Sequence, residues 1–254
     1  MIIDAHVHIP GVKGENLGWP TASTVEEVVR KLDDAGIDKA VITSITSTVA
    51  KDMEGIRAGN RQMLATLKAY PGRFIGACQV HPGFPDESLR ELRTMHDEHG
   101  IVWLGELCGY LGGYTYDTPA FARLIEEAAR LTMIVQIHTQ DMKGLMEMAD
   151  RRPETPFVLA HMGGNPDYVG RVQAVAGREN IYIDISGSEV SRVGILEAYI
   201  REAGVAKVLF GTDYIVCEPV VYIARIQGLG LSKQDKENIL WKNVQRLLDQ
   251  ASGR

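Results

Sequence analysis

The first ten residues, 1–10, read MIIDAHVHIP. Apolar residues dominate this stretch and predict a buried β-strand, yet Asp4, His6 and His8 interrupt it at every second position. Successive side chains of a strand point to opposite faces, so we expect these three ionisable groups to share one face. A buried face that carries one acid and two imidazoles needs partners, which the rest of the chain must supply.

Further strand-like segments follow along the whole chain, separated by longer amphipathic stretches. These segments are KAVITSI (39–45), RFIGACQVH (73–81), VWLGELCGY (102–110), MIVQIHT (133–139), FVLAHMG (157–163), NIYIDIS (180–186) and KVLFGTD (207–213). Apolar residues at helical spacing predict helices over 25–36, 121–131 and 195–204. Residues 232–248 predict a last helix, with Ser232 as its N-cap.

Strands that alternate with helices pair in parallel, because each return to the sheet needs a crossover. The 254 residues also match the usual size of a (β/α)₈ barrel, about 250 residues. No GxGxxG motif follows the first strand and no GxxxxGK[ST] motif occurs, which argues against the open nucleotide-binding sheets. We therefore expect an α/β protein, a TIM-type (β/α)₈ barrel that forms a single domain over residues 1–254.

Composition and charge limit the partners of this domain. The 27 basic and 33 acidic residues give a net charge of −6, and no basic run suggests a nucleic-acid surface. No leader-like or membrane-spanning segment is evident, and the three scattered cysteines do not suggest a disulfide framework. We expect a cytoplasmic protein that acts on a small molecule, without nucleic-acid or membrane partners. Its apolar terminal helices could also form a homodimer.

Ionisable residues gather where the predicted strands end, which is where barrels of this type carry their active sites. They are four imidazoles and two carboxylates: His6, His8, Glu106, His138, His161 and Asp213. Burying this set without a cation would be costly, and neutral imidazole and carboxylate are ligands of divalent metals. We predict a divalent metal site, with Zn²⁺ as the default ion; the ligand set would also accept Mn²⁺, Fe²⁺ or Co²⁺.

The motifs DAHVH, GEL, QIHT, AHMGG and FGTDY, one near the end of each of five strands, together resemble the amidohydrolase superfamily. The closest resemblance is to its amidohydrolase-related (amidohydrolase 2) branch, which includes small metal-dependent hydrolases and decarboxylases. The resemblance implies that His6, His8, His138 and Asp213 are metal ligands. It implies that His161 binds a second metal or polarises the substrate.

The fourth strand departs from the pattern of many superfamily members, which place a carboxylated lysine there to bridge two metals. This chain offers Glu106 instead. A glutamate could bridge two ions, bind one ion, or orient a ligand imidazole. We expect Glu106 to be a ligand, and the number of ions, one or two, stays open.

The ligand set suggests metal-assisted hydrolysis as the leading hypothesis. A divalent metal lowers the pKa of bound water from about 16 to about 7. Asp213 would take a proton from that water and pass it on as general acid, and His161 would polarise the scissile carbonyl of an amide, lactone or ester. The alternative is non-oxidative decarboxylation of an aromatic or unsaturated acid, with Asp213 as proton donor. A TatD-like deoxyribonuclease is less favoured, because of the acidic balance and the HMGG and GTDY motifs.

Loop residues would select the substrate. Candidates for the pocket are His81 and Cys108 on strand ends, Tyr110 in the glycine-rich loop 109–117, and Trp19 in NLGWP (16–20). A decarboxylase would also need a cation for its acid substrate. The loops offer Lys13, Lys51, Arg57, Arg61 and Lys143, each of which is otherwise typical of a solvated position.

Overall fold

The structure is a computed structural model that describes residues 1–253. In this range the chain forms one sheet of eight parallel strands, paired in sequence order. The strands are β1 (Ile3–Ile9), β2 (Lys39–Ser44), β3 (Phe74–Cys78), β4 (Trp103–Cys108), β5 (Ile134–His138), β6 (Phe157–Leu159), β7 (Ile181–Asp184) and β8 (Val208–Leu209). All the predicted strands are present, although each is shorter than its sequence segment, the sixth and eighth most of all.

The first and last strands meet and close the sheet into a barrel. The backbone N–H of Ala5 donates to the carbonyl of Phe210 at 2.8 Å. A parallel bridge then joins Val7 to Tyr214. This closure confirms the predicted (β/α)₈ TIM-type barrel.

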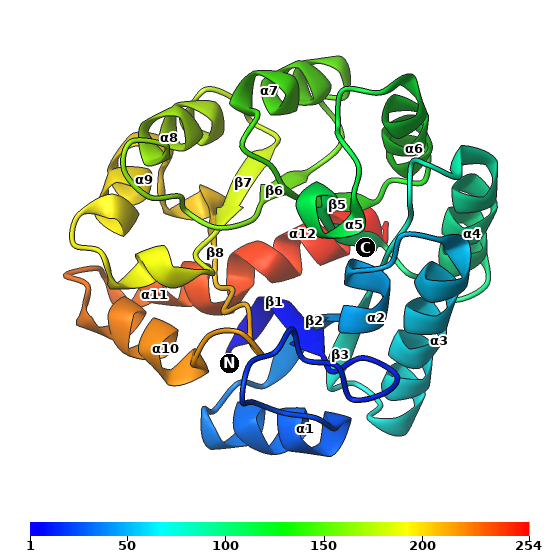
Figure 1. The fold of residues 1–254 in the computed structure, drawn as a ribbon. Helices are drawn as coiled ribbons and strands as arrows, with labels where there is room; N and C mark the ends of the chain where they lie inside the picture. Colours follow the sequence, from blue (N-terminus) through cyan, green and yellow to red (C-terminus); the bar gives the residue numbers. More distant parts are fainter. Residues whose placement is uncertain (254) are drawn as a thin grey trace.

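Helices alternate with the strands and surround the barrel (Figure 1). They are α1 (Val25–Asp34), α2 (Ile45–Thr48), α3 (Met53–Ala69), α4 (Pro85–Asp97), α5 (Gly109–Gly112), α6 (Pro119–Arg130), α7 (Met142–Arg151), α8 (Tyr168–Ala176), α9 (Ile195–Ala203), α10 (Pro219–Gly228), α11 (Lys233–Glu237) and α12 (Asn243–Ala251), with the short turns η1 (Ser188–Ser191), η2 (Val205–Lys207) and η3 (Asn238–Lys242). The helices predicted over 25–36, 121–131 and 195–204 are confirmed as α1, α6 and α9. The Ser232 cap is also confirmed, but the last helix is divided, because a π-helical turn separates α11 from α12.

The first helix shows how local sequence fixes an element. The Thr24 hydroxyl accepts from the backbone N–H of Glu27, and the Glu27 carboxylate accepts from that of Thr24. This reciprocal capping satisfies donors that the helix itself cannot. Val28 and Leu32 are fully buried on the inner face of α1. Gly36 then ends the helix at a φ of 75°, which glycine adopts without strain.

The last helix, α12, packs across the amino-terminal end of the barrel (Figure 1). Its Val244 and Leu247 lie in one apolar cluster with Ile3 and Trp103, the first residues of β1 and β4. Packing on the barrel therefore accounts for the apolar face of this helix, and a homodimer stays a prediction. None of the described helices is both long and apolar enough to cross a membrane.

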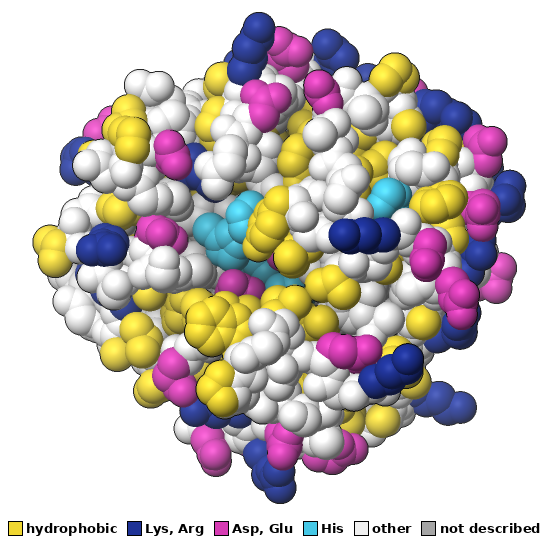
Figure 2. Space-filling model, in the orientation of Figure 1, with side chains coloured by type: hydrophobic (Ala, Val, Ile, Leu, Met, Phe, Trp, Pro, Cys, Tyr) yellow, Lys and Arg dark blue, Asp and Glu magenta, His cyan; other side chains and the backbone are white. Residues whose placement is uncertain are grey.

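The opposite face of the barrel, where the strands end, is hollowed. Figure 2 shows histidine side chains inside this hollow, with hydrophobic side chains along its rim.

Candidate metal centre

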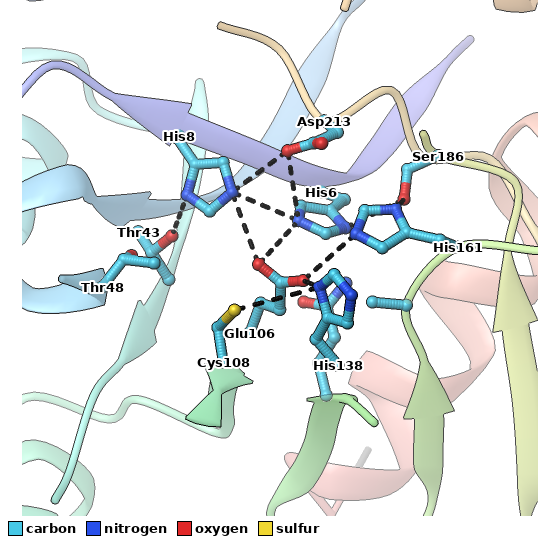
Figure 3. Close-up of polar contacts among 12 residues, drawn as sticks. His6, His8, Thr43, Thr48, Glu106, Cys108, His138, His161, Ser186 and Asp213 are labelled. Atoms are coloured by element: carbon cyan, nitrogen blue, oxygen red, sulfur yellow. Dashed lines mark hydrogen bonds and ion pairs between the residues drawn. The ribbon is translucent and has the colours of Figure 1, made fainter. Parts of the chain in front are cut away.

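The ends of the strands bring all the predicted metal ligands into one cluster (Figure 3). The cluster consists of His6 and His8 on β1, Glu106 on β4, His138 at the end of β5, His161 just after β6 and Asp213 just after β8. These residues are far apart in the sequence, so only barrel closure can assemble them.

Four potential ligand atoms lie close together at the centre of the cluster. The Nε2 atoms of His6 and His8 are 3.3 Å apart. Oε2 of Glu106 lies 3.4 Å from His6 Nε2 and 3.6 Å from His8 Nε2. Oδ1 of Asp213 lies 3.6 Å from His6 Nε2 and 3.2 Å from His8 Nε2.

The chemistry of these donors fits a divalent metal ion. Nδ1 of His6 donates to Oδ2 of Asp184 at 3.1 Å, and Nδ1 of His8 lies 2.9 Å from the hydroxyl of Thr43. With protons on the Nδ1 atoms, both Nε2 lone pairs face the same point, an arrangement that a cation stabilises. Atoms that bind one tetrahedral ion at about 2.1 Å lie about 3.4 Å from one another, which is the spacing observed.

A second cluster shares Glu106 through its other oxygen. Oε1 of Glu106 lies 2.9 Å from Nδ1 of His138 and 3.3 Å from Nε2 of His161. These three side chains also form a group whose donor atoms lie close enough to hold an ion. The two oxygens of Glu106 thus face two sets of imidazoles, so Glu106 would be able to contact an ion in each set.

Mutual attraction keeps these buried groups charged. Burial alone raises the pKa of Glu106, but three neighbouring imidazoles, His6 foremost, lower it well below its usual value. Burial lowers the pKa of His6, whereas Glu106 and Asp184 raise it well above its usual value. Protons on the imidazoles therefore balance the carboxylates, and a divalent cation can replace those protons.

The seventh strand supplies two supporting residues that the sequence analysis missed. Asp184 ends β7 and accepts hydrogen bonds from Nδ1 of His6 at 3.1 Å and Nε2 of Gln136 at 2.8 Å. The hydroxyl of Ser186 donates to Asp184 and lies 2.8 Å from Nδ1 of His161. Because its proton is given to Asp184, this hydroxyl accepts from Nδ1–H of His161, which directs Nε2 of His161 toward Glu106, where a bound cation could replace the Nε2 proton.

Asp4 lies beside the centre without entering it. Its carboxylate accepts from the backbone N–H of His6 at 3.0 Å, from that of Thr212 at 3.0 Å, and from the Thr212 hydroxyl at 2.6 Å. Burial raises the pKa of Asp4 to about 7, against the effect of these donors. Asp4 therefore ties β1 to the segment that leads to Asp213.

Strained backbone places three of the site residues. His161 has a φ of 64° and Asp213 a φ of 61°, in the left-handed region that non-glycine residues rarely adopt. Gly105, directly before Glu106, has a φ of 101°, and a Cβ atom there would lie 2.1 Å from the carbonyl oxygen of Gln136. Only glycine fits this position, so Glu106 depends on Gly105 for its place.

The four predicted pocket residues have different surroundings. Cys108 is buried with Sγ 3.9 Å from Nδ1 of His138, and burial raises its pKa, so it is not an activated nucleophile. Tyr110 is 71% exposed and its ring packs edge-on against His138 at 5.1 Å. A cavity of about 580 Å³ beside His138 includes Tyr110 in its wall, together with Tyr114 and Tyr116.

The other two pocket residues have no observed part in the centre. His81 uses both ring nitrogens within loops: Nδ1 accepts from Gly83 N–H at 3.0 Å, and Nε2 donates to the Gly112 carbonyl at 3.0 Å. It therefore holds the end of α5 and does not present a free nitrogen to substrate. Trp19 is 51% exposed, and among residues 1–253 its ring forms no aromatic pair with a histidine of the centre.

A parallel barrel with imidazoles and carboxylates clustered at the ends of its strands defines a metal-dependent enzyme. The chain belongs to the Amidohydrolase family whose model, Amidohydro_2, matches residues 3–250. The predicted resemblance is thereby confirmed, and the deoxyribonuclease alternative gains no support. No protein with a curated description matches the chain.

Several solved structures with the same fold are decarboxylases. The 2,6-dihydroxybenzoate decarboxylase from Rhizobium is 18% identical, with a TM-score of 0.76 and 98% of each chain covered. The 5-carboxyvanillate decarboxylase from Sphingomonas paucimobilis is 17% identical, with a TM-score of 0.76 and 98% of each chain covered. A dihydroxybenzoic acid decarboxylase from Polaromonas, with bound manganese and 2-nitroresorcinol, is 18% identical, with a TM-score of 0.77 over 98% of this chain and 96% of that chain.

Together, the family and the site indicate a metal-dependent enzyme, either a hydrolase or a carboxy-lyase. A divalent metal as cofactor is supported by the cluster and by manganese in similar structures, whereas zinc in particular stays a prediction.

Proposed function

We propose that this protein is a divalent-metal-dependent decarboxylase of a small aromatic or unsaturated carboxylic acid. The likeness over nearly the whole chain to manganese-containing decarboxylases carries this proposal. It supports the alternative that the sequence offered better than it supports hydrolysis, our first expectation. We place the reaction at the mouth of the barrel, above His8 and Asp213.

A bound divalent cation would hold the substrate carboxylate and a neighbouring oxygen and stabilise the charge that develops there. Asp213 engages His8 and His6 through Oδ1 only, and its side chain is 14% exposed, so its second oxygen can meet the substrate. As the bond to the departing carboxyl group breaks and CO₂ leaves, the carbon left behind keeps the electron pair, and this oxygen delivers to it a proton taken up from solvent. His8 and His6 keep Asp213 in place for that transfer.

The cavity beside His138 suits a planar substrate. Tyr110, Tyr114 and Tyr116 line it, and aromatic side chains in a wall favour contact with an unsaturated ring. Of the candidate cations for the acid, Arg57 is already paired with Glu87 at 2.7 Å. The Lys51 side chain, by contrast, lies against Gly113 at the end of α5, which brings it to the loop that carries Tyr110.

Hydrolysis of a lactone, amide or ester is the second candidate, and Glu106 favours it. A carboxylate between two imidazole clusters matches hydrolases in which two ions hold the attacking and leaving oxygens. In that case Asp213 would take a proton from the attacking water and pass it to the leaving group.

A paired substrate panel distinguishes the two candidates. Protein loaded with Mn²⁺ or Zn²⁺ is offered dihydroxybenzoates and, separately, lactones and aromatic amides, with release of CO₂ and of free acid measured. We expect CO₂ from a hydroxylated benzoate, and a loss of at least about 100-fold for Asp213→Asn. The matched control Asp97→Asn, on exposed α4, should keep full activity. Acid released from a lactone or amide, without CO₂ from any carboxylate, would overturn the proposal in favour of hydrolysis.

A further inference from the structure

Arg171 on α8 is a buried cation that forms no salt bridge with any carboxylate of residues 1–253. Its side chain is 1% exposed. Its guanidinium group donates to the carbonyls of Ala160 at 3.0 Å, His161 at 2.9 Å and Thr139 at 2.8 Å. A further bond reaches Oε1 of Gln140 at 3.2 Å. Buried arginines usually pair with an acid, and an apolar residue would fill this space at a lower cost in free energy of desolvation. Stability alone therefore does not account for an arginine at this position.

The accepting carbonyls lie at the ends of two neighbouring strands of the metal centre. Thr139 directly follows His138, the last residue of β5, and Ala160 directly precedes His161. One side chain thus joins the two segments that carry the imidazoles facing Oε1 of Glu106. The bond to the carbonyl of His161 also restrains a residue that has a φ of 64°.

The surroundings of Arg171 keep it in this position. Gly163, with a φ of 74°, lies directly under the side chain, and a Cβ atom there would come within 2.5 Å of Cδ of Arg171. Nε of Arg171 has no hydrogen-bond partner within residues 1–253, so both terminal nitrogens are committed to the strand ends while Nε is left unsatisfied. The hydrogen bonds of Arg171 thus hold the two strand ends, although the unsatisfied Nε makes its burial costly.

We propose that Arg171 is a positioning residue of the metal centre: by holding the backbone after β5 and β6, it aims His138 and His161 at Glu106 and so sets the affinity for the second ion. The inference rests on the proposed metal centre. It does not depend on whether the reaction is decarboxylation or hydrolysis.

Metal titration of Arg171 variants tests the proposal. Affinity for Zn²⁺ and Mn²⁺ is measured by competition with a chelating dye, alongside the visible spectrum of the Co²⁺ form and urea unfolding. We expect Arg171→Met to lower the weaker of the measured affinities by about 10- to 100-fold, the usual effect of losing a residue that orients a ligand. The Co²⁺ spectrum should change as well. Arg171→Lys, which keeps the charge with fewer donors, should lie between Arg171→Met and the unchanged protein.

Asn180 offers a matched control at the other end of the barrel. Asn180 lies directly before β7, and its side-chain amide donates to the carbonyls of Ala149, Arg152 and Thr155 in α7 and the segment before β6. Asn180→Ala removes a similar set of bonds to backbone, so it should lower stability and leave metal affinity and the Co²⁺ spectrum unchanged.

Each outcome decides a separate point. Unchanged affinity and spectrum in Arg171→Met would overturn the inference, even if the variant is less stable. If Arg171→Met does not fold, Arg171→Lys decides on the same readouts. An unchanged protein that binds one ion only, or whose variant loses affinity no more than Asn180→Ala does, also overturns the inference. Failure of the unchanged protein to bind any divalent ion would overturn the proposed function itself.

Discussion

At the scale of single residues, Glu106 joins the two halves of the centre, because each of its oxygens faces different imidazoles. Glu106→Gln keeps the shape of the side chain and removes its charge. The lowered pKa means that this charge is present at neutral pH. We expect metal affinity to fall by at least about 100-fold, more than the loss typical of a residue that only supports a ligand. Titration of metal-free protein with Zn²⁺ and Mn²⁺ measures the change.

Glu127→Gln is the matched control for this prediction. Glu127 lies on α6, where it binds Arg93 and Arg130 away from the strand ends, so the same chemical change should leave metal affinity as it was. Equal affinity in Glu106→Gln and the unchanged protein would mean that Glu106 orients imidazoles and does not bind the ion.

The sequence allowed the ligand candidates to be named because charged side chains interrupt otherwise apolar strands, as His6 and His8 do. It did not reveal Asp184 or Ser186. Their segment, YIDIS, carries an acid at a strand end like other segments, but its role depends on His6 lying beside it across the closed barrel. That adjacency is a property of the fold. A search for every acid at a strand end would have found Asp184.

At the scale of elements, two register shifts in the sheet could not be predicted from the alternation of side chains along a strand. The register of β1 against β2 shifts between Asp4 and Val7, and that of β4 against β5 shifts between Leu104 and Leu107. The alternation of side chains between the two faces of the sheet is therefore interrupted in the segments that carry His6 and Glu106. Such irregularities are common next to active sites, where they redirect a side chain. Helices were predicted well because capping and apolar spacing are local, as Thr24 shows in α1.

The ion pairs of Glu127, on α6, with Arg93 on α4 and Arg130 on α6 predict how the stability of the protein depends on pH. Hydrogen bonds from Arg130 and Arg93 lower the pKa of Glu127 from 4.5 to about 2. The unfolded chain therefore takes up this proton first, so the stabilisation is present above pH 4.5 and is lost as the pH falls toward 2. Because both arginines are half exposed, we expect Glu127→Gln to lower the free energy of unfolding at pH 7 by only about 1 kcal/mol.

Urea denaturation of Glu127→Gln and the unchanged protein at several pH values checks this expectation. The difference between them should shrink as the pH falls below 4.5. Glu126→Gln, which changes an exposed acid that pairs with Arg152, should have a smaller effect at every pH. A difference that grows in acid would contradict the assigned direction of the pKa.

At the scale of the whole molecule, the number and order of the strands could be predicted, and the closure of the barrel followed from them. Closure brings His6, near the start of the chain, next to Asp213. The loops that would choose a substrate could not be predicted in the same way. Trp19 and Tyr110 lie on segments whose conformation depends on packing against particular neighbours. Such contacts leave no regular spacing of apolar residues in the sequence from which they could be predicted.

The same closure predicts that metal stabilises the entire barrel. The ligands come from β1, β4, β5 and the segments after β6 and β8, so a bound ion would connect the two ends of the chain. An ion present at 1,000 times its Kd adds about 4 kcal/mol if it binds only the folded state, and a chain of this size gains about 2–4 °C in Tm per kcal/mol. We therefore expect removal of metal with a chelator to lower Tm by about 10 °C, and Tm to rise again with the logarithm of added Zn²⁺ or Mn²⁺. Calorimetry measures both effects, and Glu106→Gln should reduce them while Glu127→Gln should not. A Tm that does not respond to metal in the unchanged protein would mean that the cluster is held by its own ion pairs and binds no ion.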